Sequence, residues 1–172
     1  TAFAFNRENP LGNIVFMRFQ VYNKGPKTLE NCYFSIWDDP DLGGAGDDLV
    51  GSDTALSLGF CYNANNSDQY YGSRPPAYGV DFFQGPLEYT GDLADTAKMW
   101  GQLWPMYRNQ GMSSFSKYIN GTDPNDYVET YNYMNGLNAN GSDYTYNGTP
   151  TKFVHTGDPV TGTGDLDASP AD

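Results

Sequence analysis

Apolar and polar residues alternate over several short stretches of the chain, and this alternation predicts β-strands. The first stretch covers residues 13–22, where Val15, Met17, Phe19 and Val21 share one face. Side chains two positions apart point to the same side of a strand, so this spacing is typical of a strand with one buried face. We therefore expect a strand here, followed by a turn at the Gly and Pro residues of NKGPK.

Three further stretches have the same character. Residues 30–37 place Cys32, Phe34 and Ile36 on one face, and residues 55–62 align four apolar side chains in the same way. Residues 78–84 form another apolar run that ends at a Gly-Pro pair. Residues 92–107 fit a short helix or an irregular crossing equally well.

One helix is predicted near residues 124–135. Asp123 is suited to the N-cap, Pro124 to the first helical position, and Gly136 to the end of the helix. The spacing of four and three residues predicts a shared, core-facing stripe of Tyr127, Tyr131 and Met134.

The composition fits a β-rich fold. Of the 172 residues, 38% are hydrophobic and 16% aromatic, and 20 glycines supply many turns. We expect a mainly β protein, an antiparallel, jelly-roll-like β-sandwich with one short helix and long loops. A single domain is predicted over residues 1–155, and the sparsely apolar residues 156–172 are predicted to form an extended tail or linker.

The charge excludes several partners. A net charge of -12 disfavours nucleic acid and anionic membranes, which bind clustered Lys and Arg. No apolar run is long enough to insert into a membrane. Asp dominates the acidic residues, and Asp in Gly-rich loops commonly surrounds a hard cation with oxygen.

The acidic residues are concentrated between residues 38 and 53, in WDDPDLGGAGDDLVGSD. Such crowded like charges are unfavourable unless water or a cation neutralises them, and calcium suits a flexible loop better than magnesium. The spacing is not that of an EF-hand, because Gly43 and Val50 occupy ligand positions when Asp39 is placed first. The alternative is a solvated acidic turn. The predicted calcium ligands are Asp38, Asp39, Asp41, Asp47, Asp48 and Asp53, with Asn63, Asn65 and Asp68 as additional candidates from the next loop.

Motifs for catalysis are missing from the sequence. His155 is the only histidine, and no nucleophile elbow or zinc-ligand spacing is present. We therefore predict a protein that is not an enzyme. Trp37, Trp100 and Trp104 fit either a packed core or a flat sugar-binding platform.

The remaining candidate sites concern covalent modification. Cys32 and Cys61 could form one disulfide or remain buried thiols. Four asparagines satisfy the N-x-S/T acceptor pattern, namely Asn65, Asn120, Asn140 and Asn147. Thr54 and Thr96 each follow Asp and precede Ala, a pattern associated with O-glycosylation in Bacteroidota.

Four segments together resemble a module of large secreted surface proteins from Bacteroidota-like bacteria. They are SIWDDPDLGGAGDDLVGSDTALSLGFCYN, SRPPAYGVDFFQGP, GMSSFSKYING and TKFVHTGDPVTGTG. The resemblance implies export by a type IX system and an extracellular location at the cell surface, and it carries no established activity. Related sequences are expected to have Cys where this chain has Ser52, which argues against the disulfide.

These observations predict an extracellular structural protein. We expect a subunit or module of a surface fibre, filament or adhesin that is stabilised by calcium, carries glycans, and joins copies of itself through strand edges. The alternative is a carbohydrate-binding module of a larger secreted enzyme, in which exposed tryptophans would contact glycans.

Overall fold

The computed structural model describes residues 1–119 and 121–169. Strands make up 30% of the structure and pair antiparallel, which confirms the mainly β class. The largest sheet has three strands, so the β-sandwich itself stays a prediction. Contacts within the chain define two compact units, Thr1–Cys32 and Tyr33–Asp172.

The first unit, which we call the N-terminal arm, is residues Thr1–Cys32. Strand β1 (Ala2–Ala4) pairs with β2 (Val15–Met17), and a 3-10 helix, η1 (Pro10–Asn13), connects them. Every residue of the arm is described, and none is buried. The strand predicted over residues 13–22 therefore forms over Val15–Met17 alone, and Phe19 and Val21 beyond it are 73% and 68% exposed.

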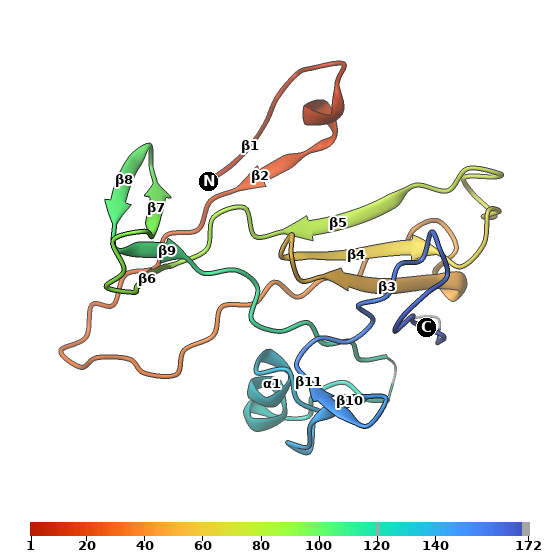
Figure 1. Cartoon of the computed structure of the whole chain (residues 1–172). Helices are drawn as coiled ribbons and strands as arrows, with labels where there is room; N and C mark the ends of the chain where they lie inside the picture. The colour runs from red at the N-terminus through yellow and green to blue at the C-terminus, as the bar shows by residue number, and fades with distance from the viewer. Residues whose placement is uncertain (120, 170–172) are drawn as a thin grey trace. The chain divides into compact units, whose positions relative to one another are not determined.

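The main sheet of the second unit contains β3 (Asp48–Asp53), β4 (Leu58–Asn63) and β5 (Ala77–Asp81), in that order (Figure 1). The predictions for β4 and β5 are confirmed to within a few residues. Strand β3 lies inside the stretch predicted as an acidic loop, because Leu49, Val50 and their neighbours pair along β4. The strand predicted over residues 30–37 is wrong, since those residues form no ladder and Phe34 is 62% exposed.

Short hairpins and one helix complete the second unit. A short 3-10 helix, η2 (Ala45–Asp47), leads into β3. Two hairpins are β7 (Thr96–Met99) with β8 (Gln102–Pro105) and β10 (Tyr144–Tyr146) with β11 (Thr149–Thr151). Strands β6 (Leu87–Tyr89) and β9 (Tyr107–Asn109) also pair antiparallel, and the β7–β8 hairpin lies between them in the chain. Residues 92–107 thus contain the β7–β8 hairpin, and both the short helix and the irregular crossing expected there are wrong.

The predicted helix is α1 (Tyr127–Met134). It begins one turn later than expected, because the carboxylate of Asp126, and not that of Asp123, accepts the N–H groups of Val128 and Glu129 at 2.8 and 3.0 Å. Gly136 ends the helix with a φ of 70°, a conformation that glycine adopts without strain. The stripe predicted to face the core is wrong in part, since Tyr127 is 84% exposed.

The interior of the second unit is unusually polar. The buried hydrophobic residues among those described are Leu42, Cys61 and Ala97, whereas the buried polar residues are Asp48, Ser52, Asn63, Asp68 and Asp167. Charged side chains are rarely buried without a partner, because removing a charge from water is costly. These side chains gather at two polar centres, one around Asp48 and the other around Asp167.

The C-terminal segment 156–169 does not have the extended form predicted for it. Asp167 is 5% exposed, and its carboxylate accepts the Val50 N–H of β3 at 2.9 Å and the Lys117 ammonium at 2.6 Å. The Asp165 carboxylate accepts the backbone N–H of His155 at 2.8 Å. Because these bonds join the segment to β3 and to residues before it, the segment belongs to the folded unit.

Of the two alternatives for the cysteines, the structure has the free thiols, because Cys32 and Cys61 form no disulfide. Cys61 is 3% exposed on β4, and burial is the main cause that raises its pKa to about 12. Ser52, where Cys is expected in related sequences, is also buried and donates its hydroxyl to the Val154 carbonyl at 2.9 Å.

We expect one thiol of the native chain to react rapidly with Ellman's reagent and the other to react only after unfolding. Cys32 is exposed, whereas Cys61 is buried and its high pKa keeps it protonated. The measurement is the absorbance time course with and without denaturant, with Cys32→Ser as the control that removes the fast phase. A fast phase that survives in Cys32→Ser would contradict the burial of Cys61.

Candidate cation-binding site

The acidic site is built around Asp48, the first residue of β3. Asp48 is 2% exposed, and its Oδ2 accepts the Leu42 N–H at 2.8 Å. Its other oxygen, Oδ1, is buried and has no hydrogen-bond partner among the described residues. A buried carboxylate oxygen without a donor is costly, so this atom is suited to a ligand that supplies positive charge.

Asn63 faces Asp48 across the sheet. The antiparallel register pairs the first residue of β3 with the last residue of β4, which places both side chains at the same end of the ladder. Asn63 is 9% exposed, and its amide nitrogen donates to Asp47 Oδ2 at 2.7 Å. Its amide oxygen, like Asp48 Oδ1, is buried without a partner in the described part of the chain. Two orphaned oxygen acceptors therefore belong to directly paired residues.

The next loop brings further oxygen atoms to this end of the sheet. Asn65 donates to Asp47 Oδ2 at 3.0 Å. Asp68 is 6% exposed and accepts backbone N–H groups from Gly44, Tyr70 and Tyr71 at 2.6–2.8 Å. An open hollow of about 480 Å³ is lined by residues 44–47, Asp68 and Gln69, and neither Asp48 nor Asn63 is among its lining residues. The additional ligands suggested by the sequence thus lie at the site.

The charges of the cluster disfavour ionisation of Asp48. Burial is the largest cause that raises the pKa of this carboxyl, and the neighbouring carboxylates of Asp47, Asp41 and Asp68 raise it further, in that order. The Leu42 N–H opposes the shift. A bound cation would favour the ionised form of Asp48, because opposite charge lowers a carboxyl pKa.

Half of the predicted ligands lie elsewhere, and the prediction of a six-aspartate site needs correction. Asp38 hydrogen-bonds to Tyr78 of β5 and raises the pKa of that phenol to about 12. Asp39 lies near Tyr118. Asp53 is at the far end of β3, where its carboxylate accepts the N–H groups of Ala55 and Leu56 in the hairpin turn. Because a strand rises about 3.3 Å per residue, Asp53 is roughly 16 Å from Asp48.

The oxygen donors at the site are of mixed kinds. Among residues 1–119 and 121–169, no three His, Cys, Asp or Glu side chains form a ready metal-binding group. The site would therefore combine the carboxylates of Asp48 and Asp47 with the Asn63 amide oxygen and backbone carbonyls. Calcium accepts such mixed sets, because it takes six to eight oxygen ligands in flexible geometry.

The predicted glycosylation residues are spread over the surface. Thr54 is exposed in the turn between β3 and β4, and Thr96 is exposed at the start of β7. Asn65, Asn140 and Asn147 are exposed, whereas Asn120 lies outside the described residues. Asn65 is the one described candidate whose amide contacts the acidic cluster.

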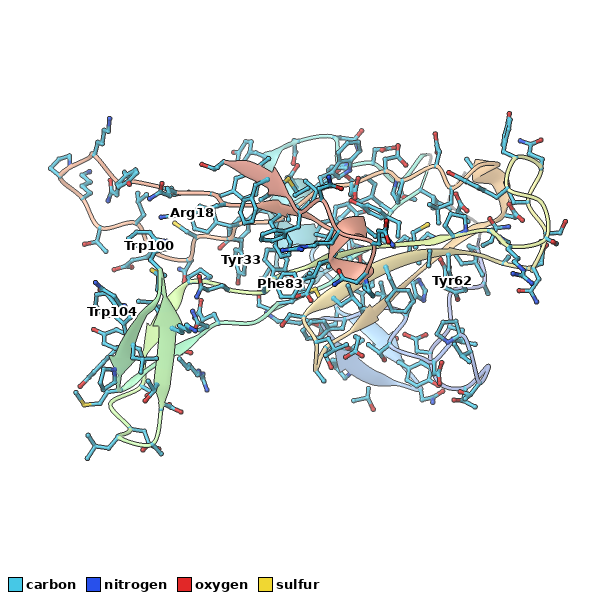
Figure 2. The ribbon with its side chains drawn as sticks, turned by 90° about the horizontal axis from the view of Figure 1, so that it is seen from above. Arg18, Tyr33, Tyr62, Phe83, Trp100 and Trp104 are labelled. Atoms are coloured by element: carbon cyan, nitrogen blue, oxygen red, sulfur yellow. The ribbon has the colours of Figure 1, made fainter. Side chains whose placement is uncertain are left out.

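The three tryptophans are exposed and contribute little to a core. Trp100 and Trp104, on the β7–β8 hairpin, are 62% and 39% exposed (Figure 2). Trp104 packs edge-on against Tyr107, with 5.9 Å between ring centroids. Trp37 is 67% exposed and hydrogen-bonds to Tyr118. Core packing, which we favoured for the tryptophans from the sequence, is therefore wrong for Trp37 and Trp100.

The chain matches no protein-family model, no curated protein and no solved structure. None of the helices in the described residues is long and apolar enough to cross a membrane.

Proposed function

We propose that this chain is an extracellular structural module that assembles with copies of itself into a surface fibre or adhesin. We further propose that calcium stabilises it by binding at the Asp48 cluster, that is, Asp48, Asn63 and the neighbouring Asp47. The observation that carries the calcium proposal is the pair of buried, unpartnered oxygen atoms on Asp48 and Asn63. The neighbouring carboxylates of Asp47, Asp41 and Asp68 act on Asp48 and raise the pKa of its carboxyl. The resemblance to secreted surface proteins supports the extracellular location.

The chemistry of the cluster favours calcium over other cations. The donors are carboxylate and amide oxygens, which hard cations prefer, and no imidazole or thiolate is among them. Calcium also tolerates the irregular geometry of a strand end and a loop, whereas magnesium requires a near-ideal octahedron and retains its water. In the extracellular medium, millimolar calcium is sufficient to occupy a site of modest affinity.

Assembly is supported by the apolar surface of the N-terminal arm. Large apolar side chains of the arm are exposed, and an exposed apolar patch of this kind is typical of a protein contact. They include Phe3, Phe5, Leu11, Val15, Met17, Phe19, Val21 and Leu29. The arm carries four basic and two acidic residues, a net charge of +2. Because the whole chain has a net charge of -12, the remaining residues have a net charge of -14. We propose that the arm binds a second copy of the chain, where strand pairing would complete the predicted sandwich.

Replacing Val21 by aspartate is expected to abolish self-association. The side chain is 68% exposed and the arm buries nothing around it, so the change leaves the fold of one copy intact while placing a charge in the contact. Sedimentation velocity over a range of concentrations measures the effect. The matched control is Val160→Asp, at a valine that is 93% exposed in the C-terminal segment.

Self-association should also weaken as salt is added, because the arm and the rest of the chain carry opposite charge. Monomers at every concentration in the wild-type chain would contradict the assembly proposal. Equal association of the Val21→Asp and wild-type chains would show that the arm is not the contact.

A carbohydrate-binding module is the second candidate function. The exposed tryptophans favour it, since an exposed indole ring offers a flat apolar face to a sugar ring. This candidate predicts glycan binding that depends on Trp100 and Trp104. Saccharide titration of Trp100→Ala and Trp104→Ala tests it, because loss of binding in these variants would support the module.

A further inference from the structure

The second polar centre lines a groove of about 420 Å³ that the calcium proposal does not use. Residues 117–119, Thr122, the β10–β11 hairpin and the C-terminal segment contribute its walls. Among the lining side chains are Tyr118, Tyr144, His155 and Asp165. The volume falls in the range of small-molecule sites.

Two side chains in this groove have unused hydrogen-bonding groups. The Tyr144 hydroxyl and His155 Nδ1 are buried, and neither makes a hydrogen bond of ordinary geometry to the described residues. The hydroxyl of Ser116 lies near Tyr144 and donates to the Tyr133 carbonyl at 2.7 Å, so it can only accept a bond from Tyr144, and the acceptor lone pairs of the Tyr144 oxygen stay unused. Buried polar atoms are nearly always paired, so two such atoms lining one groove indicate a partner outside the described residues.

His155 is held in place by several contacts. The backbone N–H of His155 donates to Asp165 Oδ2 at 2.8 Å, and its backbone carbonyl accepts the Ser52 N–H at 2.9 Å. Its Nε2 is 3.6 Å from Asp167 Oδ1, and its Nδ1 is 3.9 Å from Asp165 Oδ1. Burial lowers the pKa of this imidazole more than the two aspartates raise it, which favours the neutral ring. A neutral imidazole has one donor and one acceptor nitrogen, so it can pair with a hydroxyl in either direction.

The charge and the aromatic lining restrict what the groove can bind. Asp165 and Asp167 repel anions, and the Lys117 ammonium is already paired with Asp167 at 2.6 Å. Tyr118 stacks at a tilt on Tyr133, with 4.9 Å between ring centroids, and is hydrogen-bonded to the exposed Trp37. A neutral ligand with hydroxyl groups on its edges and apolar faces matches this combination.

We propose that this groove binds a neutral saccharide, whose hydroxyl groups pair with the Tyr144 hydroxyl, His155 Nδ1 and Asp165 Oδ1. The proposal names a site for glycan recognition distinct from the tryptophans of the β7–β8 hairpin. It does not depend on calcium binding or on self-association, so it can fail without affecting either.

Titration of the full chain with neutral disaccharides tests the proposal. The probes are cellobiose, mannobiose and N,N′-diacetylchitobiose at up to about 10 mM, a concentration that detects dissociation constants in the weak millimolar range. Isothermal calorimetry and saturation-transfer NMR measure binding. We expect at least one probe to bind.

Tyr144→Phe should weaken that binding about tenfold, because it removes one hydrogen-bonding hydroxyl and keeps the ring. His155→Asn should weaken it similarly, and asparagine tolerates the positive φ of 56° at this position. The control is Tyr127→Phe, at a tyrosine that is 84% exposed on α1 and lies outside the groove. Unchanged melting temperatures would show that the variants are folded.

Several results would overturn the proposal. One is the absence of binding for every probe, which would mean that water alone fills the groove. Another is binding that persists in Tyr144→Phe and His155→Asn but is lost in Trp100→Ala or Trp104→Ala, which would place the sugar on the β7–β8 hairpin.

Discussion

Replacing Asp167 by alanine is expected to lower the free energy of unfolding by about 3–5 kcal/mol, the usual effect of breaking a buried ion pair. The side chains of Lys117 and Asp167 are 10% and 1% exposed, and their charged atoms are 2.6 Å apart. Burial alone would raise the pKa of Asp167, but the Lys117 ammonium and the N–H groups of Val50 and Ser169 together lower it. The substitution would leave the Lys117 charge without its partner and release the C-terminal segment from β3.

Urea denaturation of the variants measures this loss. Lys117→Met is expected to be similarly destabilising, whereas the double variant Lys117→Met with Asp167→Leu should regain much of the stability, because an apolar pair removes both buried charges. The control is Glu88→Gln, which breaks the exposed ion pair with Arg108 and should have little effect. Additive losses in the double variant would contradict the direct coupling of the two charges.

Saturating calcium is expected to raise the melting temperature by about 5–10 °C relative to the chelated protein. Calcium at 100 times its dissociation constant contributes about 2.7 kcal/mol to the native state. For a chain of this length, each kcal/mol shifts the midpoint by about 2–4 °C. The physical reason is that calcium would neutralise the crowded carboxylates and supply a partner for the buried oxygens of Asp48 and Asn63.

Asp48→Asn should abolish the calcium response while leaving the protein folded. Without calcium this variant should melt at or above the wild-type temperature, because it removes a buried charge from among like charges. Asp53→Asn is the matched control, since Asp53 is at the opposite end of β3. Scanning calorimetry in calcium and in a chelator measures both variants. An equal calcium shift in Asp48→Asn and wild type would exclude the site.

Strand β4 and helix α1 are predicted well from the sequence, because each is specified by residues within or directly beside it. The alternation in LSLGFCY specifies β4, and the Asp and Gly residues that flank α1 specify a helix there. Asp126 replaces Asp123 as the cap because the chain offers two aspartates in adjacent turns, and the pattern alone does not choose between them.

The arm shows why a strand pattern is not sufficient for a strand. Residues 13–22 alternate as well as those of β4, but Phe19 and Val21 are exposed and not part of a ladder. A strand requires hydrogen bonds from a neighbour, which the alternation in one segment cannot supply. β3 shows the reverse, because the many aspartates around Leu49 and Val50 obscured a strand that pairing with β4 stabilises.

The acidic site was predictable in part. The density of aspartates identifies the region, and the carboxylates of Asp41 and Asp47 do raise the pKa of Asp48. Asp53 could not be excluded in advance, because its separation from Asp48 depends on the intervening residues being extended. The pairing of Lys117 with Asp167 had no signal in the sequence, since 50 residues separate them and each belongs to an irregular segment.

Calorimetric titration of calcium into the metal-free chain tests the central proposal most directly. We predict a saturable binding isotherm for the wild-type chain, no measurable binding for Asp48→Asn, and wild-type binding for Asp53→Asn. A flat titration of the wild-type chain at millimolar calcium, or an unchanged isotherm in Asp48→Asn, would contradict a calcium site built on Asp48.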